Sequence, residues 1–303
     1  MLKNREKMIK NADFLSENAN IFKCPICSSQ MQIVDSKSLI CTNHHCFDIA
    51  RRGYINFLSH AHKTKYNKQM FNFRNIISKN GFFAPLTQQI SKVIINTKPK
   101  NSPIKILDAG CGEGSHLSNI LEKAKQNAAN NLLGVGMDIS KEGIYIASRE
   151  YPHSIWCVAD IAQCPFANKQ FNFIVNILSP SNYSEFQRML ADDGMIIKVI
   201  PGSQYLQELR KIFYAQTDKQ VYSSNKIINL FRNHLDLQDM QQLKYRIDLD
   251  NTLIKPLVYM TPLSWGVTEE RMQKVLEMSS AKITIDLIIL IGRKRRPLPP
   301  KIC

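Results

Sequence analysis

The stretch IKILDAGCGEGSHL, residues 104–117, decides the fold of this chain. A short apolar run leads into Asp108, three glycines follow at alternate positions, and a helical pattern begins after them. Glycine lacks a Cβ, so the backbone can turn sharply at the end of a strand and approach a ligand closely. Gly110, Gly112 and Gly114 therefore predict a strand, a tight turn and a helix, with a cofactor held against the turn.

The spacing of the glycines narrows the choice of cofactor. A nicotinamide fingerprint has the pattern G-x-G-x-x-G, whereas this turn reads G-x-G-x-G and has Ser115 where the third glycine would fall. Asp108, two residues before the first glycine, suits a ligand with a charged amine better than one with a pyrophosphate. S-Adenosylmethionine carries such an amine on its methionine part, so the turn favours this cofactor.

Two further acids stand at the ends of the next predicted strands. Asp138 closes the stretch 132–138, and Asp160 closes the stretch 154–160. In a doubly wound fold such strand ends meet at the edge where ligands bind. We expect Asp138 to accept hydrogen bonds from the ribose hydroxyls and Asp160 from the adenine amino group. Together with Asp108 they predict a methyltransferase, and a dinucleotide-binding domain is the alternative.

Around the turn, short apolar runs alternate with amphipathic helical stretches, which is typical of a parallel sheet with helices on both faces. We predict a doubly wound, Rossmann-like α/β domain over 104–292, with an added helical piece over about 222–278. The predicted strands are 104–109, 132–138, 154–160, 171–178, 194–200 and 282–292.

A second motif lies near the N-terminus. Cys24 and Cys27 form a C-x-x-C pair, and the stretch CTNHHC, residues 41–46, follows after 13 intervening residues. Two short ligand pairs at this separation are typical of a closed, structural zinc site, whose binding energy replaces the core that a small domain cannot form. Cys41 supplies a third ligand. Spacing alone leaves three candidates for the fourth: His44, His45 and Cys46.

The charge of the chain is concentrated at its ends. A total of 40 Lys and Arg against 25 Asp and Glu gives a net charge of +15. Residues 1–100 hold 16 basic and 5 acidic residues, a net of +11, whereas residues 101–200 hold 8 and 10, a net of −2. A basic N-terminal part favours a polyanion as partner, because basic side chains that neutralise phosphates release counterions. A solvated basic surface is the alternative.

Composition also bounds the segments and the compartment. The predicted segments are a polar extension (1–20), a zinc finger (21–58), a helical linker (59–103), the α/β domain (104–292) and a basic, proline-rich tail (293–303). No apolar run long enough for a membrane span or a secretion signal is found, so we expect a cytoplasmic protein. Its eight cysteines are expected to be reduced.

With both motifs, the chain resembles the 23S rRNA (guanine-N1)-methyltransferase family, in which a zinc finger precedes a class I methyltransferase domain. The resemblance runs from about residue 22 over nearly the whole chain. The stretches that carry it are FKCPICSSQM (22–31), ICTNHHCFDIARRGYINFL (40–58), NGFFAPL (80–86), ILDAGCGEGSHL (106–117), ADDGMIIKVIPG (191–202), YLQELRKIFY (205–214) and YMTPLSW (259–265).

The resemblance implies roles for particular residues. The family's finger has C-x-x-C and C-x-x-x-H followed by one residue and FD, which implies His45 as the fourth zinc ligand beside Cys24, Cys27 and Cys41. Implied cofactor contacts lie on the turn, on an aromatic residue before the linker and on a residue after the fifth strand: Gly112, Glu113, Gly114, Phe83 and Tyr205. The family has Tyr in place of Phe83 and His in place of Tyr205.

The resemblance further implies methylation of N1 of a guanine in a hairpin loop of 23S rRNA, and it allows a homodimer. Tyr183 and Trp265 are candidates for stacking on a guanine that leaves its stack, although Trp265 suits packing equally well. Asn176 and Ser179 are candidates for the base by position only, so the base stays unassigned.

Basic residues that follow the finger are expected to contact RNA phosphates. They are Arg51, Arg52, Lys63, Lys65 and Lys68. Two other classes of function remain as alternatives: a small-molecule methyltransferase, and an RNA-binding zinc module with an inactive cofactor site.

Overall fold

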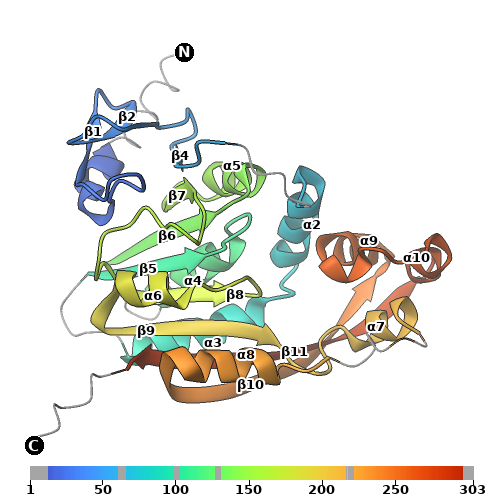
Figure 1. Ribbon diagram of the computed structural model, residues 1–303. Helices are drawn as coiled ribbons and strands as arrows, with labels where there is room; N and C mark the ends of the chain where they lie inside the picture. The colour runs from blue at the N-terminus through green and yellow to red at the C-terminus, as the bar shows by residue number, and fades with distance from the viewer. Residues whose placement is uncertain are drawn as a thin grey trace, which may run out of the picture.

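The computed structural model describes residues 13–60, 66–97, 103–126, 131–215, 217 and 222–295. Its centre is an eight-stranded sheet in the order β10-β11-β9-β8-β5-β6-β7-β4, and a small sheet, β1-β2-β3, lies near its β4 edge (Figure 1). The strands of the large sheet are β4 (Ile55–Asn56), β5 (Ile104–Ala109), β6 (Leu132–Asp138), β7 (Ile155–Val158), β8 (Phe171–Ile177), β9 (Leu190–Pro201), β10 (Leu235–Asp250) and β11 (Ser280–Lys294).

The order of the strands fixes where a ligand can bind. Neighbouring strands from β4 to β9 are parallel, whereas β11 runs antiparallel to both β9 and β10. From β5 the chain builds the sheet through β6 and β7 in one direction, and then through β8 and β9 in the other. Open α/β sheets bind ligands at the carboxyl ends of the strands where the order reverses. The predicted doubly wound α/β fold is confirmed.

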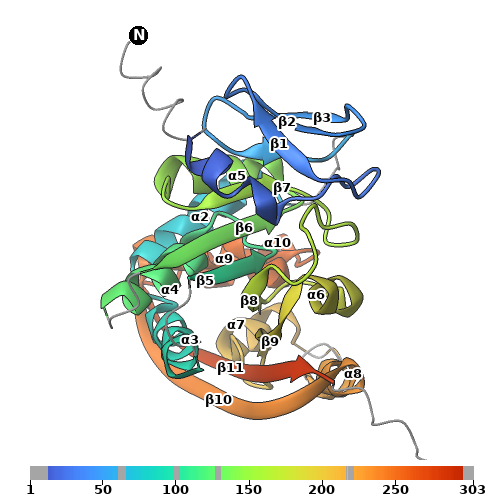
Figure 2. The same ribbon diagram turned by 90° about the vertical axis from the view of Figure 1, so that its left-hand side faces the viewer.

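Helices cover both faces of the sheet (Figure 2). Successive residues of a strand point to opposite faces, and in β5 Ile106 belongs to one buried cluster while Leu107 belongs to the other. The first cluster packs against α2 (Lys68–Lys79), α3 (Ala84–Thr97), α4 (Ser115–Gln126), α5 (Lys141–Glu150), α7 (Gln207–Phe213), α9 (Asn251–Met260) and α10 (Glu269–Leu276). The second packs against α6 (Tyr183–Met189) and α8 (Asn225–His234).

Part of the segment 222–278 differs from the helical piece predicted for it. Helices α8, α9 and α10 and the short helix η3 (Pro262–Ser264) lie there, but 235–250 form the long strand β10, which pairs with β11. Apolar and charged residues alternate from Leu243 to Leu249, and the apolar ones lie on the more buried side. A period of two is the pattern of a strand with one covered face. The helical prediction is therefore wrong for these residues.

The N-terminal part forms a ribbon that packs directly on the large sheet. It contains η1 (Ala19–Ile21), β1 (Met31–Val34), β2 (Ser38–Cys41) and β3 (Cys46–Asp48). Although β4 lies within the predicted finger, it adds a strand to the large sheet by pairing with β7. The Phe22 ring lies 5.7 Å, between ring centroids, from both Phe57 and Phe166. The ribbon and the α/β domain thus share one buried cluster.

The segment predicted as a helical linker contains α2 and α3, which connect β4 to β5 along the chain and also pack on one face of the sheet. Several predictions lie outside the described residues: most of the polar extension, Lys63, Lys65, the end of the linker and most of the basic tail. Within the described part of the chain, no helix has both the length and the apolar character needed to cross a membrane.

Candidate metal centre and cofactor site

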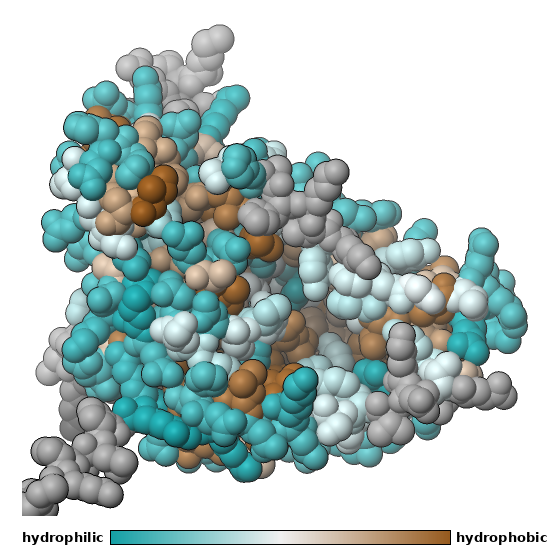
Figure 3. Space-filling model, in the orientation of Figure 1, coloured by the Kyte–Doolittle hydropathy of each residue, from teal (hydrophilic) through white to brown (hydrophobic). Residues whose placement is uncertain are grey.

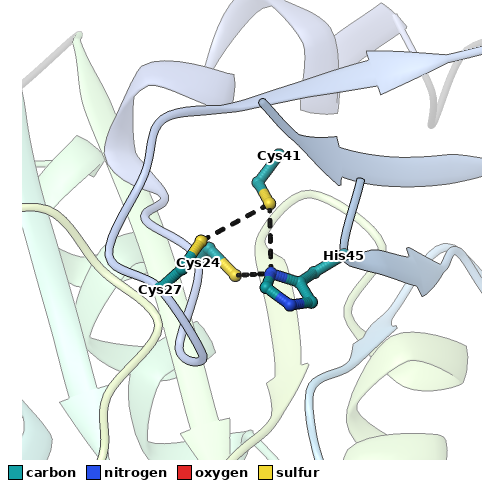
Figure 4. Close-up of side chains that lie close together, drawn as sticks. All are labelled: Cys24, Cys27, Cys41 and His45. Atoms are coloured by element: carbon teal, nitrogen blue, oxygen red, sulfur yellow. Dashed lines mark hydrogen bonds between the residues drawn. The ribbon is translucent and has the colours of Figure 1, made fainter. Parts of the chain in front are cut away.

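Four side chains of the ribbon converge on one point (Figure 4). The His45 Nδ1 atom lies 3.5 Å from the Cys24 Sγ and 3.4 Å from the Cys41 Sγ, and the Sγ atoms of Cys27 and Cys41 are 3.6 Å apart. All four ligand atoms lie within 4.8 Å of one another. A tetrahedral zinc ion with Zn–S bonds of about 2.3 Å requires sulfur atoms about 3.8 Å apart. The cluster has the size and the donor set of a closed zinc site.

Two tight turns bring these ligands together. The Ser28 amide donates to the Cys24 carbonyl oxygen (2.8 Å), and the His44 amide donates to that of Cys41 (2.9 Å). Ser28 and His44 both adopt left-handed backbone angles, with φ of 62° and 61°. His44 therefore serves as the corner of the second turn, and the next residue, His45, points to the sulfur atoms. Neither His44 nor the exposed Cys46 belongs to the cluster.

The thiols differ in how readily they ionise. Hydrogen bonds from the side chain and backbone of Ser29 lower the pKa of Cys27 to about 5, whereas burial raises the pKa of Cys24. The thiolate is the form that binds metal. Cys27 is thus ionised at neutral pH. The more buried Cys24 has to lose its proton when the metal binds.

The glycine turn needs glycine for two separate reasons. Gly110 and Gly114 both have a φ of 83°, a conformation that other residues rarely adopt. A Cβ atom on Gly110 would also lie 2.0 Å from the Ser179 Oγ, and one on Gly114 would lie 2.6 Å from the Trp156 ring. The turn is therefore closely packed between the segment after β8 and the sheet.

Asp108 is a buried carboxylate that has no hydrogen-bond partner among the described residues. Asp108 is 1% exposed, and neither of its side-chain oxygens accepts a hydrogen bond from a described residue. Burial raises the pKa of Asp108 to about 7, against the opposing influence of the Arg74 guanidinium. A carboxylate left without donors at the ligand edge of the sheet fits a bound cation that donates hydrogen bonds. The ammonium group of S-adenosylmethionine is such a cation.

This geometry gives the first prediction, which concerns pH. If Asp108 holds the ammonium group of the ligand, it does so in its ionised form, and its pKa is about 7 in the free protein. Affinity should therefore be fully present above pH 8 and should fall by up to about tenfold per unit as the pH drops below 7. Calorimetric titration of S-adenosylhomocysteine at pH 8.0, 7.0 and 6.0 measures this. An affinity that stays constant over the range would show that Asp108 does not hold the amine.

Glu113 anchors helix α2 to the turn. Its buried carboxylate lies 3.3 Å from the Arg74 Nε, measured to Oε2, and accepts a hydrogen bond from the Ser115 hydroxyl on its other oxygen. Sequence reasoning missed Arg74. Its only signal was a basic residue between the buried positions Phe71 and Asn75 of an amphipathic helix. Glu113 thus ties α2 to the glycine turn, and its contact with the cofactor stays a prediction.

The other two acids stand at the strand ends predicted for them. Asp138 accepts hydrogen bonds from the amides of Gly112 and Ser140, both at 2.8 Å, and so ties the turn to the end of β6. Asp160 is partly exposed after β7 and accepts from the Ala162 amide at 2.8 Å. Because each carboxylate oxygen has two lone pairs, both acids can still accept from a ligand. The structure brings Asp108, Asp138 and Asp160 to one edge of the sheet.

The two aromatic residues implied by the resemblance lie deep. Phe83 is 2% exposed and its ring meets the His116 ring edge to face, with centroids 4.7 Å apart. Tyr205 is buried, which raises the pKa of its hydroxyl to about 12. Both belong to the buried cluster that includes Cys111 of the turn.

The two aromatic residues considered for guanine stacking differ in exposure. Tyr183 is buried between Phe186 and Phe231 and stacks on His234, which makes it a core residue. The stacking role suggested for it is therefore not supported. Trp265 is 37% exposed, and its ring meets Tyr66 edge to face at 5.3 Å.

The fold and these two sites define a class of protein, a class I S-adenosylmethionine-dependent methyltransferase with a zinc ribbon. Comparison of sequences gives the same division, because a zinc-ribbon family model described as "RlmA, N-terminal" matches residues 22–65 and one described as "Methyltransferase domain" matches residues 106–194.

Three relatives match along almost their whole length. YxjB of Bacillus subtilis (strain 168), whose name assigns it provisionally to the 23S rRNA (guanine-N(1)-)-methyltransferases, is 42% identical over 91% of this chain and 98% of its own. The 23S rRNA (guanine(748)-N(1))-methyltransferase of Streptomyces fradiae is 26% identical over 91% and 97%. A Micromonospora griseorubida protein, named provisionally for the same activity, is 25% identical over 90% and 96%. The chain belongs to the 23S rRNA (guanine-N1)-methyltransferase family, and its cofactors are S-adenosylmethionine and zinc.

Proposed function

We propose that this chain transfers a methyl group from S-adenosylmethionine to N1 of a guanine in a hairpin loop of 23S rRNA, and that its ribbon helps to bind the RNA. The proposal rests mainly on a metal cluster in the ribbon together with a cofactor edge on the large sheet, to which the same N-terminal part adds β4. The chain also matches its relatives along almost their whole length. Since the substrate is ribosomal RNA, we place the protein in the cytoplasm. Homodimerisation remains a proposal that sedimentation would test.

The residues of the chain bind and orient the reactants. S-Adenosylmethionine supplies a methyl group on a positively charged sulfur atom, and in this proposal the buried carboxylate of Asp108 holds its ammonium group. In this proposal Asp138 and Asp160 accept hydrogen bonds from the ribose and the adenine, and Phe83 and Tyr205 contact the cofactor from the buried cluster that includes Cys111. Alignment of guanine N1 with the methyl group then supplies much of the rate.

We expect the RNA to bind in the region between the ribbon and helices α7, α9 and α10 (Figure 1). The molecular surface is hollowed there, and apolar side chains are visible in the hollow (Figure 3). On the ribbon side, Arg51 and Arg52 are exposed, and Arg52 lies over the Tyr145 ring at 5.6 Å from its centroid. Lys68, at the start of α2, is also exposed. These cations are suited to phosphate groups of a bound hairpin.

The contribution of Arg51 and Arg52 to RNA binding can be measured from its dependence on salt. Replacing both, as Arg51→Glu and Arg52→Glu, should weaken binding of a 23S hairpin and flatten the plot of log affinity against log salt by about 1 to 2 units, because two phosphate contacts are lost. Affinity for S-adenosylhomocysteine should not change. A matched control replaces Lys92 and Lys125 by Glu, since these exposed residues lie on α3 and α4, away from the ribbon (Figure 2). Equal salt slopes in the two double variants would contradict the proposed RNA contact.

Methylation in vitro tests the proposed function. Purified protein, S-adenosylmethionine labelled in the methyl group and transcripts of 23S hairpins should give labelled 1-methylguanosine after digestion to nucleosides. Protein that binds the cofactor but leaves every hairpin unlabelled would contradict the proposal. Label on added small molecules would instead favour a small-molecule methyltransferase.

A further inference from the structure

A buried lysine lies beside the cofactor turn. Asn176 on β8 and Lys198 on β9 are paired in register near the carboxyl ends of the two strands. Asn176 is fully buried and Lys198 is 4% exposed. The Lys198 Nζ donates hydrogen bonds to the Asn176 Oδ1 (2.5 Å) and to the Ser179 carbonyl oxygen. Lysine is rarely buried to this extent, because removing its amine from water is costly unless the amine is paired.

The hydrogen bonds of Asn176 link this lysine to both the turn and the segment after β8. The Asn176 Nδ2 donates to the Ala109 carbonyl oxygen at 2.6 Å and to that of Pro180 at 3.0 Å. The Ser181 hydroxyl donates to the Asn176 Oδ1 at 3.1 Å. The side chain of Asn176 thus connects the last residue of β5, directly before the first glycine, with the segment 178–182. Lys198 fixes the orientation of this amide from the other side.

The segment 178–182 is held in a conformation that needs support. Leu178 has a φ of 51°, which is unfavourable for a residue with a side chain. The Ser179 side chain fills the space beside Gly110, since a Cβ there would lie 2.0 Å from the Ser179 Oγ. At its end, Asn182 caps α6 and donates to the Ile161 carbonyl oxygen, beyond β7. The segment therefore forms the wall of the site next to the glycine turn.

We propose that Lys198 is a positioning residue for methyl transfer, which orients Asn176 and the Ser179–Pro180 peptide against Gly110 so that the target base lies in line with the methyl group. This inference rests on the proposed function and adds a residue to it. An apolar side chain at 198 would leave the Asn176 Oδ1 and the Ser179 carbonyl oxygen without their shared donor, and the wall would shift. Displacement of a reactant by about 1 Å can lower a rate about 100-fold.

The test is Lys198→Met, which keeps the length of the side chain and removes the donor. We expect methyl transfer to the hairpin at saturating substrates to fall about 100-fold, while the dissociation constant of S-adenosylhomocysteine changes less than about threefold. Hydrogen exchange of the amides at 178–182 should accelerate. The milder variant Ser181→Ala should lower the rate in the same direction by a smaller factor. As a control, Lys105→Met removes a partly buried lysine at the opposite end of the sheet and should leave the rate unchanged.

The outcomes separate this inference from the proposed function. Unchanged rate and unchanged exchange at 178–182 in Lys198→Met would overturn the positioning role. A parallel loss of rate, cofactor affinity and melting temperature would also overturn it, in favour of a purely structural role. If the wild-type protein does not methylate any hairpin but exchange at 178–182 still accelerates in the variant, the proposed function fails while the role of Lys198 in shaping the wall stands.

Discussion

Replacing Cys41 by serine is expected to release the zinc ion and to unfold the ribbon. Cys41 approaches both Cys27 and His45 within the cluster, so its loss leaves three ligands. Binding of a structural zinc ion contributes an apparent free energy of about 10 kcal/mol or more, because a small ribbon has little core of its own. Zinc content measured by mass spectrometry should fall from one equivalent to near zero. Amides of β1, β2 and β3 should lose protection from hydrogen exchange.

The neighbouring cysteine provides the control. Cys46→Ser changes the same atom five residues away, but Cys46 is exposed and lies outside the cluster. Zinc content and ribbon protection should both survive. His45→Ala should behave like Cys41→Ser, and His44→Ala should keep the metal. Loss of zinc in Cys46→Ser together with its retention in Cys41→Ser would show that Cys46, and not Cys41, binds the metal.

The second large effect is expected at Asp108. Asp108→Asn keeps the shape of the side chain and removes its charge, so the ligand's ammonium loses a charge-assisted hydrogen bond in a buried site. We expect a loss of about 3 kcal/mol, which is more than about 100-fold in affinity for S-adenosylmethionine. Calorimetry measures this, and Asp193→Asn, an exposed acid on β9, should bind normally. Tight binding by Asp108→Asn would exclude the assigned role.

The same variant should make the free protein more stable. Burial raises the pKa of Asp108 from an ordinary value of 3.8 to about 7 in the folded protein. The ionised carboxyl therefore destabilises the fold, and this destabilisation grows as the pH rises from about 4 to 7 and is fully present at pH 8. Asparagine removes the charge, so the variant should melt at a higher temperature than the wild type at pH 8 in the absence of cofactor. A general folding defect would have the opposite sign.

Local patterns were sufficient to predict the turn and the metal cluster. Glycine at 110, 112 and 114 after an apolar strand, and acids at successive strand ends, have few other interpretations. Spacing restricted the zinc ligands to one short stretch, but could not choose among His44, His45 and Cys46. That choice depends on the left-handed angle at His44, which turns the chain so that His45 faces the sulfur atoms.

Features that depend on distant contacts were not predictable. Strand β10 has a clear period of two only from Leu243 onward, and its first half carries polar residues on both sides, so the sequence pattern does not identify the whole strand. Arg74 and Lys198 acquire their roles from partners far along the chain, Glu113 and Asn176. A single lysine within the apolar run GMIIKVI was the signal available for Lys198, because a buried charge in a strand needs a partner. Sequence position alone predicts Tyr183 near the substrate, whereas its ring packs into the core.

Primer extension on 23S rRNA tests most directly whether this chain methylates N1 of a guanine there. A methyl group on N1 blocks the Watson–Crick edge, so reverse transcription stops beside the modified guanine. We predict a stop in a hairpin of 23S rRNA from cells that carry the gene. The stop should disappear on deletion and return with the wild-type gene but not with Asp108→Asn. Identical patterns of stops with and without the gene would contradict the account.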